Sequence, residues 1–161
     1  MKRIIPLVLL IVFSLTIFLV VNKTTFVSEK IYKAYSETEE LPQTVVRVID
    51  GDTFVLLNGR VVRLIGINTP EYGQPYYEEA TNKLAELVEG KNVTLEIDIT
   101  NTDNYGRLLR YVYVDDTFVN LIMVKEGHAK VLIIYPDDKY AKELKEAMLE
   151  AREKRLGIWN E

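Results

Sequence analysis

The stretch 48–71, which reads VIDGDTFVLLNGRVVRLIGINTPE, places acidic and basic side chains where apolar runs begin and end. It contains Asp52, Arg63 and Glu71, and Arg107 follows in a later polar turn. The chain has no cysteine and one histidine, which excludes thiolate nucleophiles and clusters of several histidines. Any catalysis therefore depends on carboxylates, arginines and a hard cation held by oxygen atoms.

Short strands and tight turns are predicted to position these side chains. β-Branched and other apolar residues predict strands at Val45–Ile49, Phe54–Leu57 and Arg60–Ile65. Asn58-Gly59 is a strong hairpin signal between the second and third strands. Pro70 ends the run that follows, because proline has no amide proton to donate to a strand. The result is a three-stranded meander.

Polar residues stand at two corners of this meander. Asp52 and the segment Asn68–Glu71 both lie where predicted strands end, so they converge if the meander curls. Arg63 lies inside a strand, where a cation needs an anionic partner. A structural ion pair between Arg63 and Glu71 is one possibility, and it is compatible with catalysis.

The rest of the chain predicts alternating helices and strands. Apolar residues at helical spacing or in strict alternation mark each element. The predicted elements are a helix at Pro75–Val88, strands at Val93–Ile99 and Leu108–Val114, a helix at Phe118–Lys125, a strand at Ala129–Tyr135 and a helix at Asp138–Arg155.

Five motifs in order resemble those of the thermonuclease family, also called staphylococcal-nuclease-like. They are IDGDT at 49–53, RLIGINTPE at 63–71, DNYGR at 103–107, GHAKV at 127–131 and GIWNE at 157–161. Each motif alone is weak, whereas five in register are specific. The resemblance implies an α+β fold over residues 42–161, a five-stranded OB-fold β-barrel with three helices. In this chain, one N-terminal hydrophobic helix is expected before that domain.

The resemblance also implies a calcium site. Asp52 would ligate the metal through its carboxylate and Thr69 through its main-chain carbonyl. Asn68 stands where the family typically has an aspartate, so one carboxylate ligand becomes an amide oxygen. Because fewer charged ligands bind calcium more weakly, we expect a weakened metal site.

The chemistry implied by the resemblance is hydrolysis of phosphodiester bonds in DNA or RNA. Glu71 would position or deprotonate the attacking water. Arg63 and Arg107 would hold the scissile phosphate and stabilise the negative charge of the transition state. Tyr105 and Tyr135 are candidate contacts to the nucleotide.

Residues 1–21 differ from everything that follows. Residues 4–21 form an apolar run without a charge, about 27 Å long as a helix, which suffices to enter a membrane. A transmembrane anchor is favoured over a cleaved signal segment, since no small-residue cleavage pattern follows. Residues 22–41 read as a polar tether. The domain at 42–161 is then expected outside the cytoplasm, tethered by one span, or secreted if the segment is cleaved.

Charge and composition leave a second function open. The net charge of −4 is unusual for a nucleic-acid-binding protein, although the charge of one cleft can differ from that of the whole chain. A noncatalytic OB-fold module that binds nucleic acid or another ligand is the alternative. No motif indicates a protein partner, and a monomer is expected.

Overall fold

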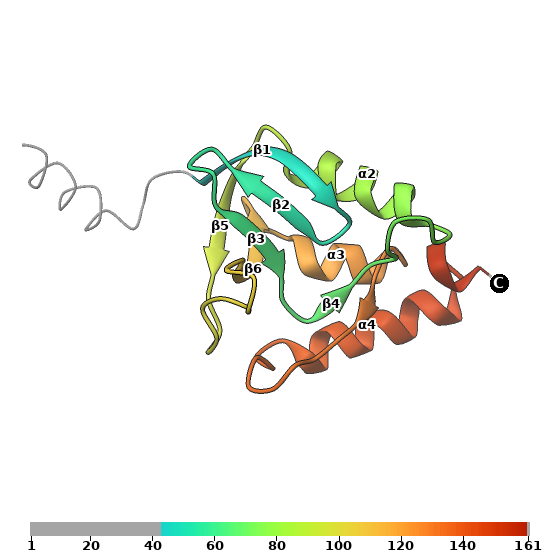
Figure 1. The fold of residues 1–161 in the computed structure, drawn as a ribbon. Helices are drawn as coiled ribbons and strands as arrows, with labels where there is room; N and C mark the ends of the chain where they lie inside the picture. The colour runs from blue at the N-terminus through green and yellow to red at the C-terminus, as the bar shows by residue number, and fades with distance from the viewer. Residues whose placement is uncertain (1–42, 161) are drawn as a thin grey trace, which may run out of the picture. The chain divides into compact units, whose positions relative to one another are not determined.

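Five strands close into a barrel in the computed structural model, which describes residues 43–160. The barrel strands are β1 (Gln43–Asp50), β2 (Thr53–Leu56), β3 (Val61–Leu64), β5 (Asn92–Glu96) and β6 (Leu108–Val114). Neighbours pair in the order β3-β2-β1-β5-β6, and β3 pairs in parallel with β6 to close the ring. The predicted α+β fold with a five-stranded barrel is confirmed (Figure 1).

Three helices and several short elements complete the domain. The helices are α2 (Tyr77–Val88), α3 (Val119–Lys125) and α4 (Ala141–Glu153). The short elements are β4 (Ile67–Asn68), β7 (Thr117–Phe118), β8 (Lys130–Val131) and the 3-10 turn η1 (Gly157–Trp159). β4 and β8 pair as a separate two-stranded ribbon, in which Asn68 faces Lys130.

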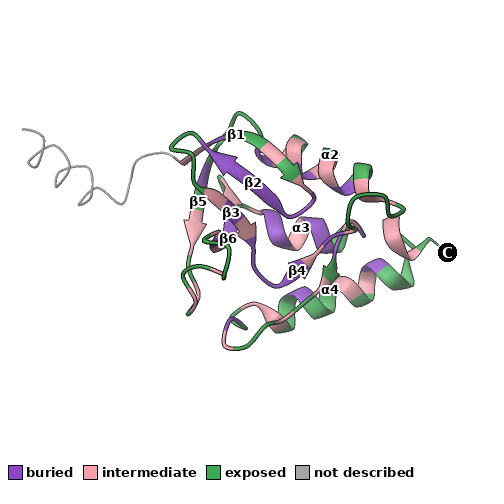
Figure 2. Cartoon of the chain, viewed as in Figure 1, coloured by how far each residue is buried: buried purple, intermediate pink, exposed green. Residues whose placement is uncertain are grey.

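The core fills the barrel and the space beneath the helices. All four residues of β2 are buried, and α2 buries Ala80, Leu84 and Val88 on one face while its acidic residues stay exposed (Figure 2). α4 buries Leu144 by the same helical spacing. Burying a large aliphatic side chain contributes roughly 1.5–3 kcal/mol, so these stripes attach the helices to the barrel.

The Asn58-Gly59 hairpin forms as predicted. Gly59 adopts a positive φ of 82°, which glycine tolerates without a steric penalty, and the Asn58 side chain accepts a hydrogen bond from the Arg60 amide. The loop is longer than two residues, because Leu57 lies outside β2 and is 73% exposed.

Two predicted strands are shorter in the structure. The alternation from Val93 to Ile99 predicted one strand, but β5 ends at Glu96. Beyond it, the amides of Ile99 and Thr100 donate to the buried Asp137 carboxylate instead of to a neighbouring strand.

The predicted strand Ala129–Tyr135 is also wrong over most of its length. Only Lys130–Val131 pairs as β8, and an isolated bridge joins Ile134 to Asp137. The chain therefore turns away after β8 and forms the wall of a cavity described below.

Pro42–Glu161 forms one compact unit. None of the helices in the described part, 43–160, has the length and continuous apolar character that a bilayer span requires. The predicted membrane segment at 1–21 and the tether at 22–41 lie outside the described residues, so both stay predictions.

Candidate active site

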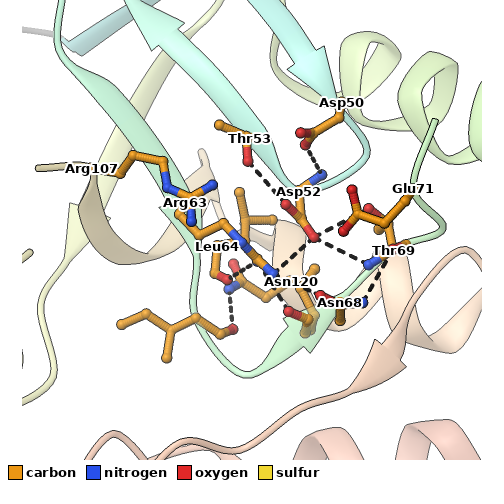
Figure 3. Close-up of polar contacts among 12 residues, drawn as sticks. Asp50, Asp52, Thr53, Arg63, Leu64, Asn68, Thr69, Glu71, Arg107 and Asn120 are labelled. Atoms are coloured by element: carbon orange, nitrogen blue, oxygen red, sulfur yellow. Dashed lines mark hydrogen bonds and ion pairs between the residues drawn. The ribbon is translucent and has the colours of Figure 1, made fainter. Parts of the chain in front are cut away.

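Asp52 lies buried in the turn between β1 and β2, with 5% of its surface exposed. Its Oδ1 accepts a hydrogen bond from Thr53 Oγ1 at 3.0 Å. Its Oδ2 accepts hydrogen bonds from the Thr69 amide at 3.1 Å and from Thr69 Oγ1 at 3.2 Å (Figure 3). The predicted convergence of Asp52 with the segment after β4 is therefore confirmed.

The surroundings of the Asp52 carboxyl group disfavour its charged form. Burial raises its pKa above the ordinary value of 3.8, the Arg63 charge opposes that rise, and the neighbouring Asp50 carboxylate adds to it. Asp50 also accepts a hydrogen bond from the Asp52 amide, which fixes the turn. A further cation beside the two aspartates would favour their charged forms.

Arg63 extends from β3 and is held by four contacts. Its Nη1 donates to the carbonyls of Leu64 at 2.8 Å and Ile67 at 3.1 Å. Its Nη2 donates to Asn68 Oδ1 at 3.0 Å and lies 3.0 Å from Asp52 Oδ2. These hydrogen bonds use Nη1 and Nη2, the contact with Asp52 is an ion pair, and the Nε–H has no protein partner within the described residues.

Asn68 and Thr69 follow Arg63 through the short strand β4. The Asn68 amide group spans two partners, because Oδ1 accepts from Arg63 and Nδ2 donates to the Thr69 carbonyl at 3.3 Å. That carbonyl is the predicted metal ligand. The Asn68 side chain, which stands where the family typically has an aspartate, therefore also donates a hydrogen bond to the carbonyl oxygen that would bind the metal.

Glu71 is exposed and starts the loop that leads to α2. Its amide donates to Gln74 Oε1 at 2.8 Å, and its carbonyl accepts from the Gln74 amide at 2.9 Å. In the view of Figure 3 its carboxylate projects toward Asp52. Among the described residues Arg63 pairs with Asp52 and forms no ion pair with Glu71, so the structural pairing of Arg63 with Glu71 is not found.

Arg107 stands at the start of β6, where the turn 103–107 presents it. Its Nε donates to Asp103 Oδ2 at 2.6 Å, and its guanidinium lies 5.5 Å from the centre of the exposed Tyr105 ring. Burial alone would raise the pKa of Asp103, but hydrogen bonds from the side chain and amide of Arg107 and from the Tyr105 amide hold it below 3.8. Both terminal nitrogens of Arg107 lack a protein partner in the described part of the chain and are free to bind an anion.

A cavity of about 440 Å³ brings the predicted substrate residues together. Its lining includes Arg63, Asp103, Tyr105, Arg107, Ile134 and Tyr135, and we call it the Arg107 cavity. Tyr105 and Tyr135 are 86% and 85% exposed, so their rings form its rim. Ile133, between the lining residues Leu132 and Ile134, packs against the core instead. The Arg63 side chain also pairs with the Asp52 carboxylate, and it therefore joins the cavity to the acidic corner.

The donor set near Asp52 fits a hard cation. Asp52, Asn68 and Thr69 offer a carboxylate, an amide and a carbonyl oxygen, which are the ligand types that calcium accepts. Over residues 43–160 no three Asp, Glu or His side chains gather closely enough to hold a metal ion. A cation would also compete with the hydrogen bonds that these oxygens accept.

Sequence reasoning missed two acids that shape the site. Asp50 fixes the turn of Asp52, and Asp103 orients Arg107. Both lie inside the quoted motifs, IDGDT and DNYGR, at turn positions where a side chain can bond the backbone two residues on. That local signal could have identified them.

Comparison with known proteins gives consistent matches. The family model described as "Staphylococcal nuclease homologue" matches residues 61–161, a range that begins after Asp52. The SPbeta prophage-derived endonuclease YokF of Bacillus subtilis (strain 168) is 42% identical over 128 residues, covering 73% of this chain and 43% of YokF. The thermonuclease of Staphylococcus intermedius is 40% identical over 124 residues, covering 71% of this chain and 74% of that protein. Endonuclease YncB of Bacillus subtilis (strain 168) is 41% identical over 128 residues, covering 73% of this chain and 61% of YncB. This chain thus spans less than half the length of YokF and less than two thirds of YncB.

Proposed function

This chain belongs to the staphylococcal nuclease family, and on that premise we propose that it hydrolyses phosphodiester bonds of DNA or RNA with the help of calcium. Relatives that match most of the described domain carry the names endonuclease and thermonuclease. Those names support a nuclease, and the chemistry below is assigned to the residues of this chain.

The position of Arg63 carries the proposal. It contacts the buried Asp52 on one side and lines the Arg107 cavity on the other. A phosphodiester that reaches Arg63 from the cavity therefore lies between two guanidinium groups and the acidic corner. This is the arrangement that hydrolysis at phosphorus requires, because charge that builds on the nonbridging oxygens meets fixed cations.

Arg107 and Arg63 have different roles in the proposed mechanism. The terminal nitrogens of Arg107 have no partner in the part of the chain that the structure describes, and they form the bidentate contact with the phosphate. Arg63 is immobilised by four contacts and offers its Nε–H at a fixed position. A donor that is already oriented needs no reorganisation as the transition state forms, and such donors contribute about 10²–10³-fold in rate.

Glu71 is the base of the proposed mechanism. Its carboxylate is exposed on the loop between β4 and α2, and that loop is fixed by the paired hydrogen bonds with Gln74. Glu71 accepts a proton from the attacking water, and a positioned general base accelerates such a step about 10²–10⁴-fold. Tyr105 and Tyr135 at the rim hold the nucleotide in the Arg107 cavity.

Calcium is proposed to bind at Asp52, Asn68 and Thr69. When bound, it supplies positive charge that offsets the charge of the phosphate and of the acidic corner. The family resemblance and the all-oxygen donor set of Asp52, Asn68 and Thr69 support this assignment.

We further propose that the domain acts outside the cytoplasm, tethered through residues 4–21 or secreted after their removal. The support for this is the uncharged apolar run in the sequence.

A noncatalytic binding module is the second candidate, and one observation favours it. Asn68 Nδ2 donates to the Thr69 carbonyl, so the amide both lowers the charge of the cation site and occupies one of its oxygens. In this second function the weakened site holds no calcium, and the domain binds nucleic acid without cutting it.

Cleavage by the full chain distinguishes the two functions. The substrates are single- and double-stranded DNA and single-stranded RNA, each with added calcium and with chelator. The nuclease predicts cutting that needs calcium and is lost in Glu71→Gln. Retained oligonucleotide binding without cutting would establish the binding module instead.

A further inference from the structure

A second cavity, of about 380 Å³, borders the site away from the arginines. Its lining includes Asn68, Thr69, Gln74, Tyr76, Lys130 and Ile158, and we call it the Lys130 cavity. Its volume lies in the range of small-molecule sites, about 300–1,000 Å³. The cavity shares Asn68 and Thr69 with the proposed calcium site, but none of the roles assigned above uses Tyr76, Lys130 or Ile158.

The short strand β4 separates the two cavities. Ile67 lines the Arg107 cavity and its neighbour Asn68 lines the Lys130 cavity, as expected for consecutive residues of a strand, which face opposite sides. Arg63 donates to both residues, to the Ile67 carbonyl and to Asn68 Oδ1. A phosphodiester held at Arg63 thus has one cavity on each side.

The charge of the Lys130 cavity suits an anion. Lys130 faces Asn68 across the β4–β8 ribbon, and its ammonium lies 5.8 Å from the centre of the Trp159 ring. Among residues 43–160 it forms no ion pair with a carboxylate, and the cavity lining contains no acidic residue. In a chain with net charge −4, an unpaired lysine in a pocket without acids is a site for a phosphate group.

Tyr76 gives the same cavity a flat, half-buried surface. It precedes the first turn of α2 with φ of 66°, in the left-handed region that residues other than glycine seldom adopt. Aromatic rings in a groove that also carries positive charge are features on which single-stranded nucleic acids stack their bases, and Lys130 lines the same cavity.

We propose that the Lys130 cavity binds the nucleotide on the far side of the scissile phosphodiester from the nucleotide in the Arg107 cavity. Lys130 contacts its phosphate and Tyr76 its base. This inference rests on the proposed nuclease function and extends it, because it requires the substrate to be a single strand that crosses β4. Productive cleavage then depends on a nucleotide on each side of the bond.

The test compares two substrates on the full chain in calcium. One is a single-stranded oligonucleotide, which fills both cavities. The other is a nitrophenyl ester of a nucleotide, which has no second phosphate to place at Lys130. In Lys130→Met, the ratio of kcat/KM for the oligonucleotide to that for the ester should fall about fivefold or more. The slope of log KM for the oligonucleotide against log salt concentration should decrease by about 0.7.

A second variant tests the base contact. Tyr76→Asn keeps a residue that tolerates positive φ and removes the ring. It should raise KM for the oligonucleotide about fivefold or more without changing the salt slope, since a base carries no charge. Lys142→Met is the matched control, because Lys142 is a 92% exposed lysine of α4, and it should leave both the ratio and the slope unchanged.

Two results would overturn the inference in distinguishable ways. If Lys130→Met leaves the substrate ratio and salt slope at their wild-type values, or lowers activity on both substrates equally, the second subsite is wrong and the nuclease stands. If the wild-type chain cleaves neither substrate, the proposed function fails, and the subsite fails with it.

Discussion

Arg63 Nη2 lies 3.0 Å from Asp52 Oδ2, and this ion pair joins the acidic corner of the barrel to the Arg107 cavity. The arginine side chain is 14% exposed and the aspartate side chain 7%. Breaking a buried pair leaves one charge without its partner, which costs more than the pair itself contributes. The ion pair is therefore part of the fold as well as of the site.

Replacing each arginine by lysine should separate these two roles. In Arg63→Lys one ammonium cannot reproduce the contacts to two carbonyls, Asn68 and Asp52, so the free energy of unfolding should fall by about 2–4 kcal/mol. Arg107→Lys should change it by less than about 0.5 kcal/mol, because the ion pair with Asp103 is partly exposed and an ammonium can also form it, while the terminal nitrogens of Arg107 have no protein partner among residues 43–160. It should still lower nuclease turnover about 10²-fold or more. Urea unfolding and oligonucleotide cleavage measure the two effects, and equal stability losses in both variants would contradict this division.

Glu71→Gln should reduce turnover about 10²–10⁴-fold while oligonucleotide affinity stays within about twofold. The loop should keep its shape, since its fixing hydrogen bonds use the Glu71 backbone and the Gln74 side chain rather than the Glu71 carboxylate. Single-turnover cleavage and fluorescence anisotropy give the two values. Glu78→Gln, an exposed acid of α2, is the control for loss of one negative charge. A Glu71→Gln variant that cuts as fast as Glu78→Gln would remove Glu71 from the mechanism.

Asn68→Asp should tighten calcium binding by roughly tenfold. The substitution removes the amide that donates to the Thr69 carbonyl and adds a carboxylate beside Asp52, and calcium affinity rises with ligand charge. The new carboxylate can still accept the hydrogen bond from Arg63. Calorimetric calcium titration of wild type, Asn68→Asp and Asn68→Ala makes the comparison. An unchanged or weaker midpoint for the aspartate variant would contradict the assignment of Asn68 as a ligand.

Local signals in the sequence were sufficient for the elements that hold the site. Asn58-Gly59 predicted a hairpin, and the strand ends after Ile49 and Ile65 predicted that Asp52 and the segment Asn68–Glu71 converge if the meander curls. The hydrogen bonds of the hairpin and of Thr69 to Asp52 confirm both. These inferences succeeded because turn chemistry and alternation act over a few residues.

Partners that are distant in sequence could not be read from such signals. The alternation of apolar and polar residues predicted a strand up to Ile99. In the structure the Ile99 amide instead donates to the Asp137 carboxylate, 38 residues further along the chain. The partner of Arg63 is a different case. Thr53 faces Arg63 in the β2–β3 hairpin, so the neighbouring Asp52, and not Glu71, forms the ion pair.

His128 should make stability fall as the pH is lowered. It is the one histidine of the chain, and burial lowers its pKa below 6.5, although the Glu126 charge opposes the shift. As the pH falls through about 6.5 the unfolded chain therefore binds a proton before the folded chain does, and the free energy of unfolding decreases.

The His128→Gln variant isolates this effect. Urea unfolding between pH 8 and 5 should show a shallower loss of stability in the variant than in wild type. The raised pKa of Asp52 acts in the opposite direction, since it favours folding as the pH falls, and it is common to both proteins. Curves that run parallel over this range would exclude His128 as the titrating group.

Gly51→Ala should damage the site through packing alone. An added Cβ at Gly51 would lie 2.7 Å from Thr69 Oγ1 and 2.8 Å from the Ala80 Cβ, closer than such atoms can approach. Thr69 must then move away from Asp52, and α2 must shift from the barrel, at a cost of about 1–3 kcal/mol. Because the Thr69 carbonyl is also a proposed calcium ligand, calcium affinity should fall together with stability.

The Gly59→Ala variant provides the comparison. A Cβ at position 59 meets nothing within 4 Å, but alanine is strained at φ of 82°, so this variant should lose stability and keep wild-type calcium affinity. Equal calcium affinity in the two variants would show that Thr69 does not need its position against Asp52 to bind the ion.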